Sequence, residues 1–115
     1  MGRTLLGALL LAGFTACSQT SLEPLPLEVD IAASRTTTVP GDTISFLVNA
    51  RGGTLVGLEI DFGDSTTDQF GTSGARTAQV TFRHAYVVRG TYMARVVVTD
   101  ALAGQKDASI EIRVN

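Results

Sequence analysis

Three aspartates near the middle of the chain are the residues best suited to hold a metal ion. Asp61, Asp64 and Asp68 could offer carboxylate oxygens to Ca²⁺, but Ca²⁺ takes about six to eight oxygen ligands, and three carboxylates do not fill that shell. We favour a structural interpretation, in which the aspartates cap backbone N–H groups of a tight turn and Gly63 adopts a conformation forbidden to larger residues. The sequence therefore predicts no metal site and no cofactor.

His84 is the only histidine and the natural starting point for a catalytic site. A zinc site would need carboxylates as its other ligands, and a Ser-His-Asp triad would need a positioned serine. Ser73 departs from the Gly-x-Ser-x-Gly elbow, because Ala75 occupies the place of the second glycine. We expect no catalytic residues. His84 and Tyr86 are expected to close the end of a strand, and Tyr92 to bond the backbone as a tyrosine corner does.

The only cysteine, Cys17, follows a short apolar run. Arg3 precedes this run, which covers residues 5–16 and is shorter than the ~20 residues that span a bilayer. A basic start, a short apolar stretch and a small residue before a cleavage point are typical of a secretory signal peptide.

The junction of Ala16 and Cys17 resembles the bacterial lipoprotein lipobox, although Phe14 stands where that family usually has leucine. The resemblance implies a diacylglyceryl group on the Cys17 thiol, cleavage before Cys17 and, through Ser18, sorting to the outer membrane of a two-membrane bacterium. Two or three acyl chains make membrane attachment effectively permanent. The alternative is ordinary signal-peptidase cleavage, which leaves Cys17 as a free thiol.

Composition excludes several classes of protein. The 115 residues have room for one small domain, and 44% hydrophobic against 17% charged residues is typical of a folded chain. A net charge of -2 argues against nucleic-acid binding, which needs clustered Lys and Arg. A single cysteine excludes a disulfide within the chain.

The elements that must position these residues are predicted to be strands. From residue 27 onward, apolar residues recur with period two, as they do on one face of a strand. Turn chemistry at residues 39–42, glycines at 52–53 and 90, and a polar segment at 66–74, expected to hold a short edge strand, separate about seven strands. This pattern favours an all-β sandwich.

Several motifs in the second half occur in a specific order. They are Ile60-Asp61-Phe62-Gly63-Asp64-Ser65, then His84-Ala85-Tyr86, Gly90-Thr91-Tyr92 and Val96-Val97-Val98-Thr99-Asp100. Together they resemble the PKD (polycystic kidney disease) domain, with Ile60 where that family usually carries Trp. The resemblance implies an immunoglobulin-like sandwich of about seven antiparallel strands, which serves outside the cell as a spacer or mediates protein and carbohydrate contacts without catalysis.

Carbohydrate recognition usually needs exposed aromatic rings. Phe46, Phe62, Phe82 and Tyr92 fall on predicted core faces, which leaves little for such a platform. Phe70 is the remaining candidate for an exposed anchor, but we favour packing of its ring under its own loop.

The sequence thus predicts a signal peptide at residues 1–16, a lipid-attachment cysteine and tether at 17–26, and a PKD-like domain at 27–115. The leading hypothesis is a lipoprotein of the bacterial cell envelope that binds or spaces envelope or extracellular proteins or carbohydrates. Two alternatives are an accessory, substrate-binding subunit of a secreted hydrolase and a calcium-dependent adhesion module that uses the three aspartates.

Overall fold

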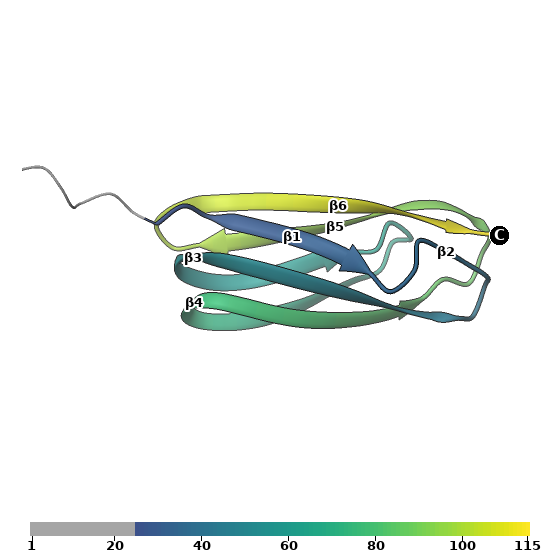
Figure 1. Ribbon diagram of the computed structural model, residues 1–115, viewed down its shortest axis with the longest axis horizontal. Helices are drawn as coiled ribbons and strands as arrows, with labels where there is room; N and C mark the ends of the chain where they lie inside the picture. The colour runs from purple at the N-terminus through teal and green to yellow at the C-terminus, as the bar shows by residue number, and fades with distance from the viewer. Residues whose placement is uncertain (1–24) are drawn as a thin grey trace, which may run out of the picture.

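The computed structural model describes residues 25–115 and is built from strands. In chain order these are β1 (Glu28–Ala33), β2 (Thr37–Thr38), β3 (Thr43–Asp61), β4 (Thr67–Ala85), β5 (Gly90–Asp100) and β6 (Gly104–Val114). Within this range no helix is long and apolar enough to cross a membrane. The predicted all-β architecture is confirmed (Figure 1).

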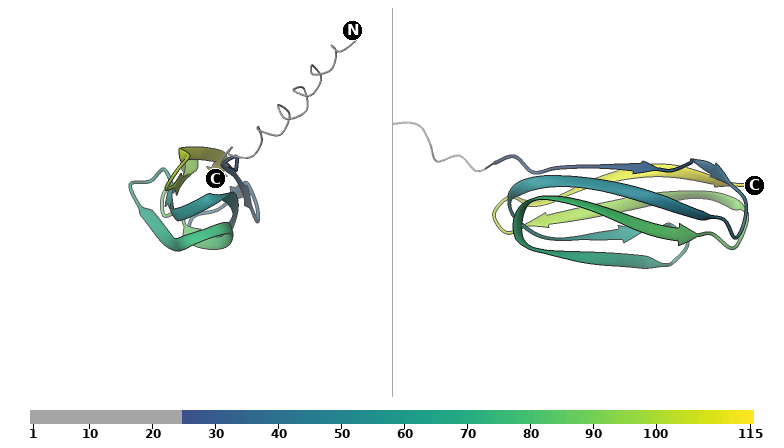
Figure 2. Two further views of the ribbon diagram at one scale, coloured as in Figure 1. Left: turned by 90° about the vertical axis from the view of Figure 1, so that its left-hand side faces the viewer. Right: turned by 60° about the horizontal axis from the view of Figure 1, so that its bottom comes forward.

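Two long strands, β3 and β4, belong to both layers of the sandwich. Residues 43–51 of β3 pair with β1 and with residues 77–85 of β4, whereas residues 55–61 pair with β5 and residues 67–75 of β4 pair with them on the other side. β6 continues the second layer beside β5, and β2 ends it. Both long strands curve back at the end where residue 25 enters (Figure 2).

This continuity corrects the prediction that Gly52 and Gly53 end a strand. The strand passes through them with a register shift between Arg51 and Leu55, because residues without side chains let the backbone bend sharply while it stays extended. In the same way, the predicted edge strand at 66–74 continues into the next one. Six strands therefore take the place of about seven, and the β2–β6 pair is parallel rather than antiparallel.

The core lies between the two layers and consists of the predicted alternating residues. Ile60, at the position where the motif usually has Trp, is fully buried. The burial of two tyrosines differs from the prediction. Tyr86, expected at the end of a strand, is fully buried, whereas Tyr92, predicted in the core, is half-buried. The largest fully buried side chains are Tyr86, Phe46, Ile44, Leu55, Ile60, Ile112, Val48, Val96 and Val98. Burying each aliphatic one is worth roughly 1.5–3 kcal/mol.

Asp100 holds the bend of β3 against the turn between β5 and β6. Its side chain accepts hydrogen bonds from the backbone N–H groups of Thr54 (2.6 Å), Leu102 (3.0 Å) and Ala103 (2.9 Å), and the residue is only 3% exposed. The N–H groups of Ala103 and Thr54, joined by that of Leu102, hold the pKa of the Asp100 carboxyl below its ordinary value. In the sequence, Asp100 is the last residue of the motif Val96-Val97-Val98-Thr99-Asp100, and the motif does not indicate its contact with Thr54.

The two glycines of the bend give a matched test of this packing. A Cβ atom on Gly52 would lie 2.8 Å from Oδ1 of Asp100 and 3.0 Å from Leu55, whereas one on Gly53 would meet nothing within 4 Å. Since Asp100 is held by its hydrogen bonds, it has little freedom to move aside. Gly52→Ala is expected to lower the free energy of unfolding by about 1–3 kcal/mol, and Gly53→Ala to change it by less than about 0.5 kcal/mol, measured by urea denaturation. Equal effects would contradict the proposed clash.

Candidate functional site

The turn between β3 and β4 is stabilised by the aspartates that the sequence singled out. Asp61 Oδ1 accepts from the N–H of Gly63 at 2.8 Å, and Asp64 Oδ1 accepts from the backbone N–H and the hydroxyl of Thr66. Gly63 has a φ of 89°, and a Cβ atom there would lie 2.7 Å from the carbonyl oxygen of Met93. The predicted turn-capping role of Asp61 and Asp64 is confirmed.

His84 closes the same turn from β4. Its Nε2 lies 2.7 Å from Oδ2 of Asp64, and both side chains are mostly buried. The imidazole ring stacks on Phe62 at a centroid distance of 4.1 Å and meets the edge of Tyr86 at 4.7 Å. Both Asp64 oxygens and the imidazole are therefore engaged in contacts within the domain, as expected of a structural pair.

The Asp64 carboxyl has a perturbed pKa. Partial burial acts to raise it, but the hydrogen bonds from Thr66 and the contact with His84 outweigh that effect, so the pKa lies below its ordinary value. The carboxylate is thus held in its charged form at neutral pH.

Two tyrosines continue this contact chain to the end of the sandwich. The Tyr86 hydroxyl donates to the carbonyl oxygen of Phe62 at 2.8 Å, and burial, followed by the charge of Asp64, raises its pKa. The Tyr86 ring stacks on Tyr92 at 4.4 Å. Tyr92 donates to the carbonyl oxygen of Val88, four residues upstream, which confirms the predicted tyrosine corner.

The structure does not bring the other candidate chemical residues together. Asp68 Oδ1 accepts from the N–H of its own neighbour Gln69, and no group of three or more His, Cys, Asp or Glu within residues 25–115 is arranged to hold a metal ion. Ser73 lies near the bend of β4 and His84 near its C-terminal end. Cys17 and the preceding apolar run lie outside the described residues.

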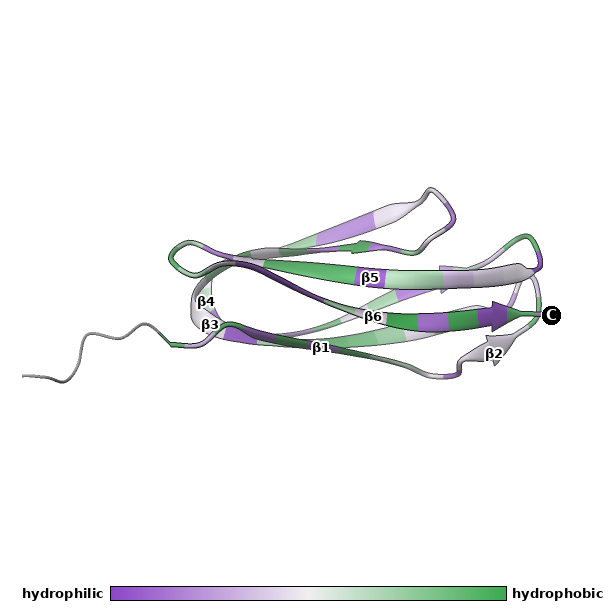
Figure 3. Ribbon diagram, turned by 90° about the horizontal axis from the view of Figure 1, so that it is seen from above, coloured by the Kyte–Doolittle hydropathy of each residue, from purple (hydrophilic) through white to green (hydrophobic). Residues whose placement is uncertain are grey.

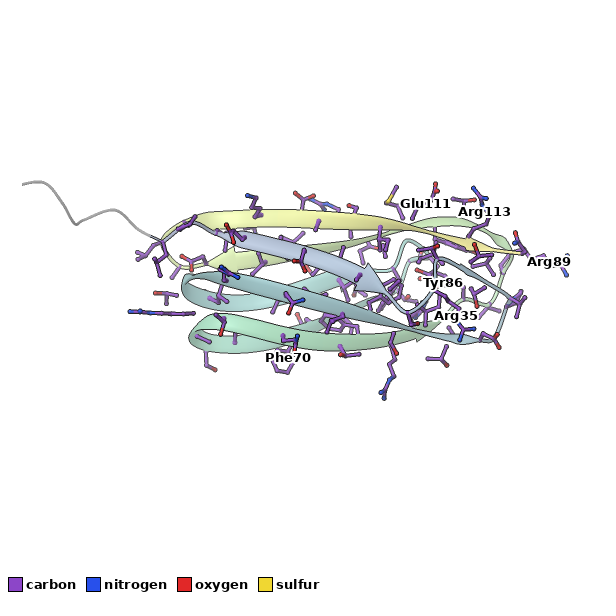
Figure 4. The ribbon with its side chains drawn as sticks, in the orientation of Figure 1. Arg35, Phe70, Tyr86, Arg89, Glu111 and Arg113 are labelled. Atoms are coloured by element: carbon purple, nitrogen blue, oxygen red, sulfur yellow. The ribbon has the colours of Figure 1, made fainter. Side chains whose placement is uncertain are left out.

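Phe70 is exposed, which corrects our prediction that it packs under its own loop. Its exposed fraction is 49%, and it lies at the β4 border of the molecule (Figure 4). The physical reason is that residues 66–74 form no loop. Almost all of them are part of β4, which pairs only with β3 among the described strands, so no further segment of the described domain covers the ring.

A shallow hollow of about 460 Å³ lies beside Phe70. Its lining includes Gly57 and Gly71, which are paired across β3 and β4 and contribute no side chains. Val56 and Val97 add apolar surface. The hollow is completed by Leu58 and by the polar residues Glu59, Gln69, Thr99 and Gln105.

This combination of apolar and polar residues suits contact with a partner surface. Phe70 and Val56 are about half exposed, and Gln69, Thr99 and Gln105 offer amide and hydroxyl groups for hydrogen bonds. Apolar anchors surrounded by polar groups are the usual composition of a binding surface. No sequence pattern indicates the hollow, because its residues come from β3, β4, β5 and β6, and only the pairing of the strands brings them together.

The Asp64 pair predicts a specific dependence of stability on pH. Asp64→Asn is expected to lower the free energy of unfolding by about 1–2 kcal/mol at neutral pH, because an amide cannot replace both accepting oxygens. The folded-state pKa lies below the unfolded value of ~3.9, so the carboxylate stabilises the fold above about pH 4 and loses this effect as pH falls through the folded pKa. Urea denaturation should show the gap between the two proteins closing towards about pH 2.

Asp68→Asn is the control, because its exposed side chain bonds only an adjacent backbone group. It should change stability by less than about 0.5 kcal/mol throughout this range. A gap for Asp64→Asn that stays constant down to about pH 2 would contradict the assignment.

Solved structures share this arrangement of strands. The PKD domain of an M14-like peptidase from Thermoplasmatales archaeon SCGC AB-540-F20 is 20% identical, with a TM-score of 0.65 over 82% of this chain and 98% of that one. The PKD domain of human VPS10 domain-containing receptor SorCS2 is 21% identical, with a TM-score of 0.57 over 84% and 80%. The CARDB domain of the PF1109 protein from Pyrococcus furiosus, solved in complex with di-metal ions, is 15% identical, with a TM-score of 0.60 over 83% and 97%.

At these identities the likeness shows the fold alone, and no curated protein is similar enough to the chain to count as a relative. The family model of the PKD domain, however, matches residues 28–114, from the first residue of β1 to the last of β6. It includes the turn with Asp61, Gly63 and Asp64 and the tyrosine corner of Tyr92 described above. The chain therefore belongs to the PKD domain family.

Proposed function

We propose that the chain is a lipid-anchored binding module of the bacterial cell envelope, which captures an extended segment of a partner protein beside Phe70. The observation that supports this most directly is an exposed aromatic ring next to a strand edge that is unpaired within residues 25–115. PKD-type domains are non-catalytic immunoglobulin-like modules. The partner's binding energy would therefore serve attachment rather than chemistry.

The edge of β4 favours a peptide over a sugar. A strand that lacks a neighbour on one side presents backbone N–H and C=O groups that a further extended chain can pair with. Along residues 67–71 every residue is exposed, so this edge is accessible. The side chains of an added strand would alternate between the face of Phe70 and the face of Gln69 and Gly71, which gives specificity in addition to the backbone hydrogen bonds.

Photo-crosslinking in cells tests this surface and does not require the partner to be identified first. Benzoylphenylalanine at position 70 is expected to form protein adducts, and the same residue at position 87, which is 81% exposed at the other end of the sandwich, is expected to form none of these. In pull-downs from solubilised envelopes, Phe70→Ala should reduce recovery of the adduct partner about tenfold, the loss typical of an aromatic hot spot.

Gly71→Leu provides a second variant that fills the hollow. A Cβ atom at Gly71 meets nothing within 4 Å, so this substitution should block the partner without disturbing the fold, which circular dichroism can verify. Identical adducts at positions 70 and 87 would contradict the proposal. Adducts with glycan instead of protein would change the ligand class, and a hydrolase as the captured protein would favour the accessory-subunit alternative.

The anchor is proposed from Cys17 and the residues before it. In a bacterial host, wild-type protein should incorporate labelled palmitate and fractionate with membranes, and Cys17→Ala should do neither, because it lacks the thiol that accepts the lipid. Cys17→Ser is the conservative control and should behave like Cys17→Ala. Equal labelling of wild type and both variants would overturn the lipid anchor and leave ordinary secretion as the alternative.

A further inference from the structure

The β5–β6 turn forms an apolar tip at the end of the sandwich where the chain enters. Ala101, Leu102 and Ala103 are all exposed, and Leu102 is 76% exposed. Connecting turns normally carry polar residues, whereas the tip of this one is coloured as hydrophobic in Figure 3. Figures 1 and 2 both place it at the same end as residue 25.

This apolar tip is held in place rather than loosely extended. The nearly buried carboxylate of Asp100 accepts hydrogen bonds from the N–H groups of Leu102 and Ala103, and the N–H of Ala101 donates to the carbonyl oxygen of Thr54 at 2.9 Å. The turn is thus tied to the bend of β3. Leu102 is presented outward by a fixed backbone, which lowers the entropic cost of covering it with another surface.

Three cations lie at the same end of the sandwich. Arg51 and Arg76 line one hollow together with Leu25, which is half exposed, and Lys106 lies near the start of β6. Arg51 pairs with Glu28 at 3.6 Å, but neither Arg76 nor Lys106 forms an ion pair within residues 25–115. Arg76 and Lys106 therefore remain available to bind an anionic surface, with Glu28 engaged by Arg51 and the Asp100 carboxylate engaged by backbone N–H groups.

The opposite end also carries cations without an ion pair within residues 25–115, Arg89 and Arg113 (Figure 4), while Arg35 there pairs with Asp42 at 3.7 Å. The two ends therefore differ in their distance from the point where the chain enters, not in the presence of cations (Figure 1). β6, with 11 residues at ~3.3 Å each, separates the two ends by about 36 Å. One end can rest on a flat surface while the other stays clear of it.

We propose that the end formed by Leu25, Arg76, Leu102 and Lys106, the proximal end, docks on the anionic lipid surface of the membrane. Leu102 enters the headgroup layer, and the two cations contact lipid phosphates. This inference rests on the proposed anchoring through Cys17, because the eight residues from 17 to 24 reach at most about 30 Å. A tether of that length gives the membrane a high effective concentration at this end, so a weak contact suffices.

Docking by the proximal end would set the orientation of the module. The sandwich would stand on the bilayer with the loop after β4 pointing away from it. The free edge of β4 and Phe70 would then face sideways, accessible to partners above the membrane. The lipid contact therefore supplies an orientation that a flexible tether alone cannot.

The test uses mature protein purified from bacterial membranes. Intact mass first establishes whether Cys17 carries lipid, which decides the anchoring separately. Ala103→Cys and Val88→Cys then receive the same environment-sensitive fluorophore, one at each end, and the proteins are reconstituted into vesicles of phosphatidylglycerol and phosphatidylethanolamine. Headgroup-spin-labelled lipid is expected to quench the probe at position 103 but not the one at 88.

Variants in the Ala103→Cys background separate the two contributions. Leu102→Ser should reduce quenching, and Arg76→Glu combined with Lys106→Glu should reduce it roughly fivefold or more. Arg89→Glu, a charge reversal of the same kind at the opposite end, should leave quenching unchanged. Raising the salt from about 0.1 M to about 1 M shortens the Debye length from about 10 Å to about 3 Å and should weaken the contact.

Two results would overturn the inference while leaving the anchor intact. The first is lipidated protein in which positions 103 and 88 are quenched equally. The second is quenching that is the same in phosphatidylcholine vesicles and insensitive to the charge reversals. Absence of lipid on Cys17 would instead overturn the anchoring proposal and the docking with it.

Discussion

The bend of β3 is the constraint on which the rest of this sandwich depends. At Gly52 the strand leaves one layer and enters the other, so a single continuous backbone joins the two sheets. The bend leaves no room for a side chain at Gly52 and is fastened by Asp100, whose carboxylate bonds Thr54 on one side and the β5–β6 turn on the other. The same bend therefore joins the two layers, closes this end of the core and positions the β5–β6 turn.

The opposite end is held by a different set of forces. In the turn at residues 61–66, Asp61 and Asp64 cap backbone N–H groups. Next to it, Phe62, His84, Tyr86 and Tyr92 form a continuous series of ring contacts. Polar capping fixes the backbone there, and aromatic contacts fix the packing. Between these two rigid ends, the edge of β4 that is unpaired among the described strands presents Phe70, and the hollow lined by Gly57 and Gly71 lies beside it.

Several features of the fold follow from local sequence. Period-two alternation predicts the core positions of Phe46, Phe62 and Phe82 correctly, and the motif around Gly63 predicts the turn and the role of its aspartates. Alternation states which face a residue occupies but not whether a second layer covers that face. For this reason the sequence predicts Tyr92 deeper than it lies and does not reveal the full burial of Tyr86. The prediction that Phe70 is covered by its own loop is wrong for a different reason, because that segment is part of β4 and leaves the ring exposed.

The sequence by itself determined the strand content, the family and the chemistry of the turn, because these depend on residues close together in the chain. Only the tertiary structure decided that the strands at 43–61 and 67–85 are continuous, that β2 pairs in parallel with β6, and that Phe70 stands at an edge unpaired among the described strands. It also decided that Asp100 meets Thr54, 46 residues away. Such contacts form between segments distant in sequence, whose proximity depends on how the layers stack, and no local pattern encodes that stacking.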